Sequence, residues 1–163
     1  MEDDLKPEKI AFGGDSSVYK VYGPDGAVYV KKVYDGGPLC NGLPIEKIYL
    51  YWEVTKKVAD LLNKKPANIF VGDEECSVVI NPIKDVLEEC GCPVLIAPFI
   101  EGETLAKHPS VGRIRAQLFK ISKTLNEELR LKGIEITPGN TKKVGGLVVV
   151  TDLCATVRGL YEV

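Results

Sequence analysis

The sequence has a single histidine and no apolar run that approaches the roughly 20 residues of a membrane-spanning helix. Its first ten residues, MEDDLKPEKI, are acidic and lack the apolar core of a secretory signal peptide. His108 has no second histidine with which to form a zinc site. We therefore expect a cytoplasmic chain with no membrane span.

An excess of either charge is also missing. The 21 basic and 23 acidic residues nearly cancel, so net charge gives no reason to expect nucleic acid as a partner. The five cysteines are odd in number and irregular in spacing, and the pair Cys90 and Cys92 lacks two further zinc ligands at a matching spacing. We expect reduced thiols and no structural metal. The 163 residues, 45% of them hydrophobic, are enough for the core of one domain.

The stretch AFGGDSSVYKVYGPDGAVYVKK, residues 11–32, predicts three strands separated by two turns. In the first turn Gly13 and Gly14 have no Cβ, and Ser16 and Ser17 have short side chains. Such a turn can lie close to a ligand and point backbone N–H groups at an anion. The third strand then supplies Lys31 or Lys32 as a cation for phosphate groups. This stretch predicts a nucleotide phosphate site.

The middle of the chain predicts one long helix and several strands. Apolar residues recur every three or four positions over residues 45–63, which predicts a helix with one buried face, including Trp52, Val58 and Leu61. Two short apolar runs within residues 68–80 surround the turn GDEE and predict a hairpin. Residues 81–92 are interpreted as a short helix or loop after Pro82, and the apolar run that follows as a strand.

A second long helix is predicted over residues 110–132. Its buried face carries Ile114, Leu118, Ile121, Leu125 and Leu129, and Gly133 is its predicted C-cap. A pair of strands is predicted to follow it. Two helices combined with antiparallel strands indicate the α+β class.

Four segments in this order resemble the protein-kinase-like superfamily. GGDSSVYKV followed by VYVKK resembles its Gly-rich loop and β3 lysine, with Ala11 and Ser16 in place of the first and third glycines and Gly13 keeping the second. CPVLIAPFIEGETL resembles the fifth strand and hinge. The segments GIEITPGN and DLC resemble the catalytic loop and the D-F-G motif.

The resemblance implies a single minimal domain over residues 1–163. Its N-lobe, residues 1–100, would be an antiparallel sheet with one helix, and the hairpin of residues 68–80 would contribute the fourth strand. Its reduced C-lobe, residues 101–163, would contain one long helix and a β-hairpin. Some minimal kinases are injected by bacteria into host cells, so delivery into a host cell is an alternative to a cytoplasmic location.

The resemblance also implies ATP and Mg²⁺ as cofactors, with a protein as substrate or partner. Lys31 would hold phosphates and pair with Glu53 or, as the second candidate, Glu46. Glu135 would be the catalytic base, and Asn140 and Asp152 would hold Mg²⁺. The remaining nucleotide contacts would come from the Gly-rich turn and from the hinge backbone behind the gatekeeper Ala97: Gly13, Gly14, Ser16, Ser17, Val18, Pro98, Phe99 and Ile100.

Three further positions, near the predicted catalytic and metal sites, depart from the family's pattern. Glu135 stands in place of an aspartate, Gly133 in place of a histidine and Cys154 in place of the D-F-G glycine. The extra methylene of Glu135 moves its carboxylate by about 1.5 Å, enough to misplace a base. Three hypotheses follow: a phosphotransferase that acts on a protein or on itself, a pseudokinase that binds nucleotide or a protein partner, and an unrelated α+β domain.

Overall fold

The computed structural model describes residues 8–12, 16–35 and 43–163. These residues form two compact units. The first unit contains the described part of residues 1–53 together with Pro82–Phe99 and Thr156–Arg158. The second contains Val54–Asn81, Ile100–Ala155 and Gly159–Val163. Helix α1, Ile45–Lys64, begins in the first unit and ends in the second, and its bounds confirm the predicted helix.

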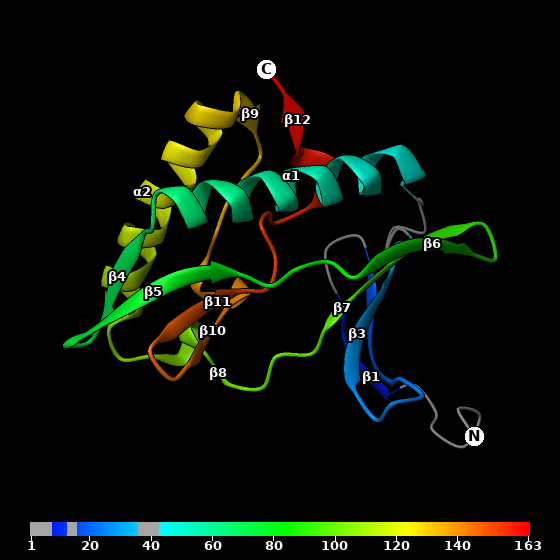
Figure 1. Cartoon of the computed structure of the whole chain (residues 1–163), viewed down its shortest axis with the longest axis horizontal. Coiled ribbons are helices and arrows are strands. Elements are labelled where there is room, and N and C mark those ends of the chain that lie inside the picture. Colours follow the sequence, from blue (N-terminus) through cyan, green and yellow to red (C-terminus); the bar gives the residue numbers. More distant parts are fainter. Residues whose placement is uncertain (1–7, 13–15, 36–42) are drawn as a thin grey trace. The chain divides into compact units, whose positions relative to one another are not determined.

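The first unit contains a five-stranded antiparallel sheet (Figure 1). Its strand order is β1-β2-β3-β7-β6, where the strands are β1 Glu8–Phe12, β2 Ser17–Tyr22, β3 Val28–Val33, β6 Asp85–Glu89 and β7 Cys92–Pro98. The turn between β2 and β3 is closed by a 3.0 Å hydrogen bond from the Gly26 N–H to the Gly23 carbonyl. The three strands predicted over residues 11–32, and the strand predicted at residue 92, are confirmed.

The prediction of a helix or loop over residues 81–92 is wrong, because β6 forms a hairpin with β7. Two residues with positive φ, Cys90 at 51° and Gly91 at 78°, make the turn between them. Such a two-residue turn matches the right-handed twist of the strands that it connects. Val86 is buried and pairs with buried Leu95, and this cross-strand contact outweighs the local pattern of the acidic segment around it.

The second unit contains a mixed sheet of order β4-β5-β11-β10-β8 (Figure 1). The strands are β4 Asn68–Val71, β5 Glu74–Ile80, β8 Glu103–Thr104, β10 Thr141–Val144 and β11 Leu147–Val150. The predicted hairpin of residues 68–80 and the predicted strand pair after the second helix are confirmed. However, β5 pairs in parallel with β11, so the hairpin belongs to this sheet and not to the β1–β3 sheet. The predicted lobe boundary at residue 100 stays a prediction.

Helix α2, Val111–Leu129, ends earlier than predicted. Arg130 is its C-cap, with φ of 54°, so the prediction of Gly133 as the cap is wrong. The next residues form β9, Leu131–Lys132, which pairs with β12, Tyr161–Glu162. Pairing with β12 stops the helix because residues 131 and 132 must be extended. Within the described residues the 3₁₀ helices are η3 Leu105–Lys107, η4 Pro138–Asn140 and η5 Val157–Gly159.

Gln117 of α2 protects the edge of the second sheet. Its side-chain amide accepts from the N–H of Phe70 at 2.7 Å and donates to the Phe70 carbonyl at 2.9 Å. A side-chain amide that bonds both the N–H and the carbonyl of one residue satisfies the hydrogen-bonding groups of an edge strand, as a neighbouring strand would. This contact fixes β4 against α2.

The predicted core is confirmed in part. Four of its eight residues are buried: Val58, Ile114, Leu118 and Leu125. The other four are half-buried: Trp52, Leu61, Ile121 and Leu129. Within residues 8–12, 16–35 and 43–163, neither long helix is apolar enough to span a bilayer.

Candidate functional site

The predicted metal ligands Asn140 and Asp152 lie at the same end of the β10–β11 hairpin. The Asn140 carbonyl accepts from the N–H of Thr151 at 2.8 Å and from the Thr151 hydroxyl at 3.0 Å. These bonds continue the strand pairing one step beyond the pair Thr141 and Val150. Asp152 follows Thr151 directly, so the hairpin brings a carboxamide and a carboxylate residue to one edge.

The loop that carries Asn140 is held by its neighbours. The Pro138 carbonyl accepts from the Thr141 hydroxyl at 2.8 Å and from the Thr104 hydroxyl at 3.3 Å. Thr141 is fully buried. Two hydroxyl donors on one carbonyl fix the turn, and with it the start of β10.

Oxygen ligands from an amide and a carboxylate suit Mg²⁺, which commonly keeps several waters and takes further oxygens from substrate phosphates. In the part of the chain that the structure describes, there is no group of three or more histidine, cysteine, aspartate or glutamate side chains placed to hold a metal. The donor types of Asn140 and Asp152 suit Mg²⁺, and the binding of the metal by these two residues stays a prediction.

Glu135, the predicted base, belongs to the same unit as this hairpin. Its side chain is exposed between the buried Ile134 and Ile136. Its N–H donates to the carbonyl of Leu153 at 2.7 Å, directly after Asp152. The backbone of the predicted catalytic loop is thus tied to the segment that carries the predicted metal ligand.

Two polar residues of α2 hold this loop, and the sequence analysis missed both. The Asn126 side chain donates to the Ile134 carbonyl at 2.9 Å and accepts from the Ile134 N–H at 3.1 Å. The Ser122 hydroxyl accepts from the Ile136 N–H at 2.9 Å. Ser122 and Asn126 are polar residues four positions apart on the inner side of an amphipathic helix. This spacing was a signal of a contact with another segment, because a buried polar group requires a hydrogen-bond partner.

At Gly133, which the resemblance places at the family's histidine position, the backbone leaves no room for a side chain. Its φ is +105°, a conformation that L-residues rarely adopt. A Cβ at this position would overlap the carbonyl oxygen of Gly159. The approach of residues 133 and 159 next to the β9–β12 pair therefore requires glycine.

We expect Gly133→Ala to lower the free energy of unfolding by roughly 3 kcal/mol or more, because it combines backbone strain with a clash against main-chain atoms. Urea denaturation followed by circular dichroism measures this loss. Gly146→Ala is the matched control, since no atom lies within 4 Å of a Cβ there and its φ is not positive. Equal unfolding midpoints for the two variants would contradict the steric explanation.

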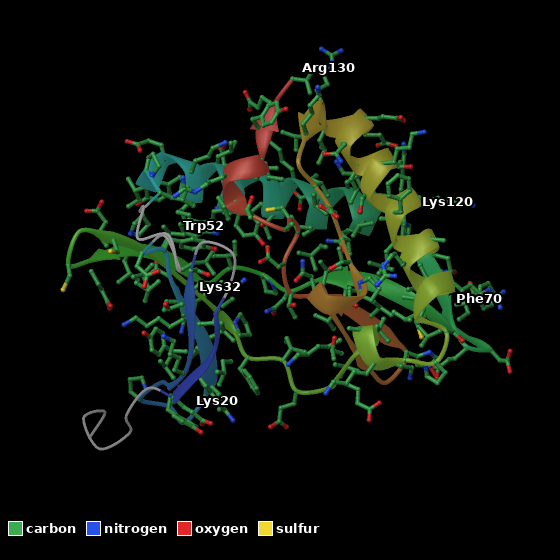
Figure 2. The ribbon with its side chains drawn as sticks, turned by 180° about the vertical axis from the view of Figure 1, so that it is seen from behind. Lys20, Lys32, Trp52, Phe70, Lys120 and Arg130 are labelled. Atoms are coloured by element: carbon green, nitrogen blue, oxygen red, sulfur yellow. The ribbon has the colours of Figure 1, made fainter. Side chains whose placement is uncertain are left out.

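In the first unit, the two lysines of β3 lie on opposite faces of the sheet. Lys31 pairs with Tyr19 and Ile96, whereas Lys32 pairs with Val18 and Leu95. Residues directly opposite each other in antiparallel strands share a face. Lys32 therefore shares a face with Val18, a predicted nucleotide contact, and Figure 2 labels its position on β3.

The face that carries Lys31 is occupied by other charge contacts. Lys31 forms an ion pair with Glu89 of β6. On the same face, Lys84 donates to the Tyr29 hydroxyl at 2.8 Å and lies 4.1 Å from the centre of the Tyr29 ring. The hydrogen bond to Tyr29 raises the pKa of Lys84. The Lys31 ammonium and the Tyr29 hydroxyl on this face therefore both have protein partners.

The Gly-rich turn is described only in part, since Gly13 and Gly14 lie outside the described residues. Ser16 and Ser17 are buried, and the Ser17 hydroxyl donates to the Asp35 carboxylate at 3.0 Å. Val18 is half-buried. The Ser17 hydroxyl therefore bonds a protein carboxylate, and the contact of this turn with phosphate stays a prediction.

The two predicted helix glutamates are exposed. Glu46 and Glu53 point away from the buried face of α1, which carries Ile48, Tyr51 and Val54 in the same part of the helix. The pairing of either glutamate with a β3 lysine stays a prediction.

Two backbone groups of the predicted hinge already have protein partners. The Phe99 N–H donates to the Val28 carbonyl at 3.0 Å, and the Ile100 carbonyl accepts from the Lys142 ammonium at 2.7 Å. Lys20 lies 4.6 Å from the centre of the Phe99 ring. Ala97, the predicted gatekeeper, is buried and pairs with Val30, on the same face as Lys32. The binding of a base by Pro98, Phe99 and Ile100 stays a prediction.

No protein-family model matches the chain, and no curated protein matches it. Two solved structures of the Mycobacterium tuberculosis PknI kinase domain are similar: one of the domain itself, with a TM-score of 0.53, and one of a double mutant, with a TM-score of 0.54. Each is 15% identical to this chain and covers 91% of it. The chain spans 57% of the length of these kinase-domain structures. The element order and these similarities together show that the chain has a protein-kinase-like fold.

Proposed function

We propose that the chain is an ATP-dependent phosphotransferase that moves the γ-phosphoryl group to a hydroxyl of a protein or of itself. The observation that carries this proposal is the pair of hydrogen bonds from Thr151 to the Asn140 carbonyl, which brings Asn140 and Asp152 to one edge of a hairpin. When bound, MgATP supplies the phosphoryl group and the metal that neutralises its charge.

The residues of the chain take separate roles in this proposal. Asn140 and Asp152 hold Mg²⁺, and Lys32 holds the phosphates. Glu135 orients the acceptor hydroxyl and accepts its proton. Its side chain is exposed, so an acceptor can reach it. Phosphoryl transfer depends mainly on positioning and on electrostatic stabilisation, so a glutamate held by a fixed backbone can serve.

The alternative is a pseudokinase that binds nucleotide or a protein partner without turnover. The exposed Glu46 and Glu53 favour this alternative, because neither is on the face of α1 that packs into the core. Gly133 favours it too, since the family's histidine is absent from the catalytic loop. Turnover with ATP separates the two functions, and nucleotide binding is common to both.

Lys32→Ala should weaken MgATP binding by roughly 10-fold to 100-fold, the effect of losing one charge-assisted hydrogen bond. The sheet register is the reason for choosing Lys32 over the Lys31 of the sequence prediction. Isothermal titration calorimetry with MgATP measures the affinity. Lys31→Ala is the matched comparison and should change it by less than about twofold, because that ammonium pairs with Glu89 on the opposite face.

The reverse result, a loss of affinity with Lys31→Ala and none with Lys32→Ala, would return the phosphate role to Lys31. No detectable heat from MgATP with the wild-type chain would remove nucleotide binding, and with it the proposed phosphotransferase.

A further inference from the structure

Lys142 of β10 makes a contact that the proposed function does not use. Its ammonium donates to the Ile100 carbonyl at 2.7 Å in a partly buried position, joining residues 42 apart in the sequence. Ile100 follows β7 closely and belongs to the predicted base-binding backbone. Lys142 pairs with Thr104 on one side and Val149 on the other, so its backbone is held by two neighbouring strands.

The whole segment from Ile100 to Thr104 is fastened to β10. Glu103 and Thr104 pair with Lys143 and Lys142 as the two residues of β8. Gly102 has a φ of +155°, and a Cβ there would lie 2.7 Å from the Lys143 carbonyl oxygen. Glycine is therefore needed for the close approach of this segment to β10. The Lys142 ammonium binds the N-terminal end of the segment through the Ile100 carbonyl.

The same strand leads to the predicted metal ligand. Asn140 directly precedes β10 and Lys142 is the second residue of the strand, so their Cα atoms are at most roughly 7 Å apart along the chain. The Pro138 carbonyl, which accepts from both Thr104 and Thr141, joins the two segments at this point. A shift of β10 therefore moves Ile100 and Asn140 together.

We propose that Lys142 is a positioning residue of the nucleotide site: its ammonium fixes the Ile100 carbonyl and so holds the backbone of Ile100 in register with Asn140 and Asp152. This inference rests on the proposed nucleotide binding. In this arrangement the N–H of Ile100 is the group that this residue offers to a base. Lys142 contributes to the affinity for the base and not to the affinity for the phosphates.

The test compares MgATP with magnesium tripolyphosphate, which has the phosphates but lacks the nucleoside. Lys142→Met removes the ammonium and keeps an unbranched chain. It should weaken MgATP binding about 10-fold, the effect of one lost charge-assisted bond, and change the binding of magnesium tripolyphosphate by less than about twofold. Lys142→Arg keeps a cationic donor and should restore most of the affinity for MgATP. Calorimetry measures the affinities of the wild type and of both variants for the two ligands.

Lys143→Met is the matched control, because Lys143 lies on the opposite face of β10. Its ammonium forms an ion pair with Glu74 at 2.9 Å, and the hydrogen bond to Glu74 raises the pKa of Lys143. This variant should leave both affinities unchanged. Three outcomes would overturn the inference. Lys142→Met could weaken the binding of MgATP and of tripolyphosphate equally, or it could keep the wild-type affinity for MgATP. Lys143→Met could lose as much affinity for MgATP as Lys142→Met does. A wild-type chain that binds tripolyphosphate but not MgATP would overturn it too, whereas one that binds neither ligand would remove the proposed function itself.

Discussion

Glu135→Gln is expected to lower phosphoryl transfer by roughly 10²-fold to 10⁴-fold and to leave the affinity for MgATP within about twofold. Glutamine keeps the shape of the side chain and removes its proton affinity. The backbone at this position should not move, because the N–H of Glu135 still donates to Leu153 and its neighbours are held by Ser122 and Asn126. Transfer of radiolabelled phosphate to the chain or to a generic protein acceptor measures the rate.

Two further variants make this prediction decisive. Glu127→Gln changes an exposed glutamate of α2 and serves as the control that should keep the wild-type rate. Glu135→Asp shortens the arm to the length usual in the resembled family, and it should raise the rate if the longer arm misplaces the carboxylate. If neither the wild type nor Glu135→Asp transfers phosphate to any acceptor while both bind MgATP, the pseudokinase alternative holds.

Asp152→Asn is expected to weaken MgATP binding by roughly 100-fold and to abolish transfer, because the variant loses the charged ligand of the metal. The amide keeps an oxygen that can accept from the N–H of Cys154, as Asp152 does at 3.4 Å, so the local turn should persist. Calorimetric titrations with ATP at fixed Mg²⁺ concentrations measure the affinity, and thermal unfolding checks the fold.

Without metal, Asp152→Asn should no longer weaken the binding of ATP. In excess EDTA the carboxylate of Asp152 faces the phosphates as an uncompensated like charge, so Asp152→Asn should bind ATP at least as well as the wild type does. Asp73→Asn, in the exposed turn between β4 and β5, is the control for a change of net charge. A wild-type affinity that does not depend on Mg²⁺ would show that Asp152 holds no metal in the complex.

Much of the fold could be predicted because its signals are local. The helices α1 and α2 follow from apolar spacing over many turns, and strands β2, β3 and β7 from short apolar runs bounded by turn residues. The ends of the β10–β11 hairpin were equally predictable, since Asn140 and Asp152 are joined through an antiparallel pair close in sequence. The resemblance to kinases rested on the order of these local signals.

The errors concern the pairing of strands. Strand β6 lies in an acidic segment with few apolar residues, so its local pattern did not indicate a strand, and its pairing with β7 makes it one. The β4–β5 hairpin was predicted, but its sheet was not, because the pairing of β5 with β11 depends on contacts about 70 residues apart that leave no local pattern. The end of α2 was predicted too late in the chain because residues 131 and 132 pair with β12, which lies about 30 residues away in the sequence.

The sequence by itself determined that this chain carries a Gly-rich turn, a lysine strand, a hinge-like segment, an asparagine and an aspartate in the order of a kinase. It left Lys31 and Lys32 as alternatives, because successive residues of a strand point to opposite faces and only the sheet decides which face is buried. The tertiary structure placed Lys32 with Val18 and Leu95, and Lys31 with Glu89. It alone joined Lys142 to Ile100, because a contact between residues 42 apart is set by the packing of strands and not by the neighbours of either residue.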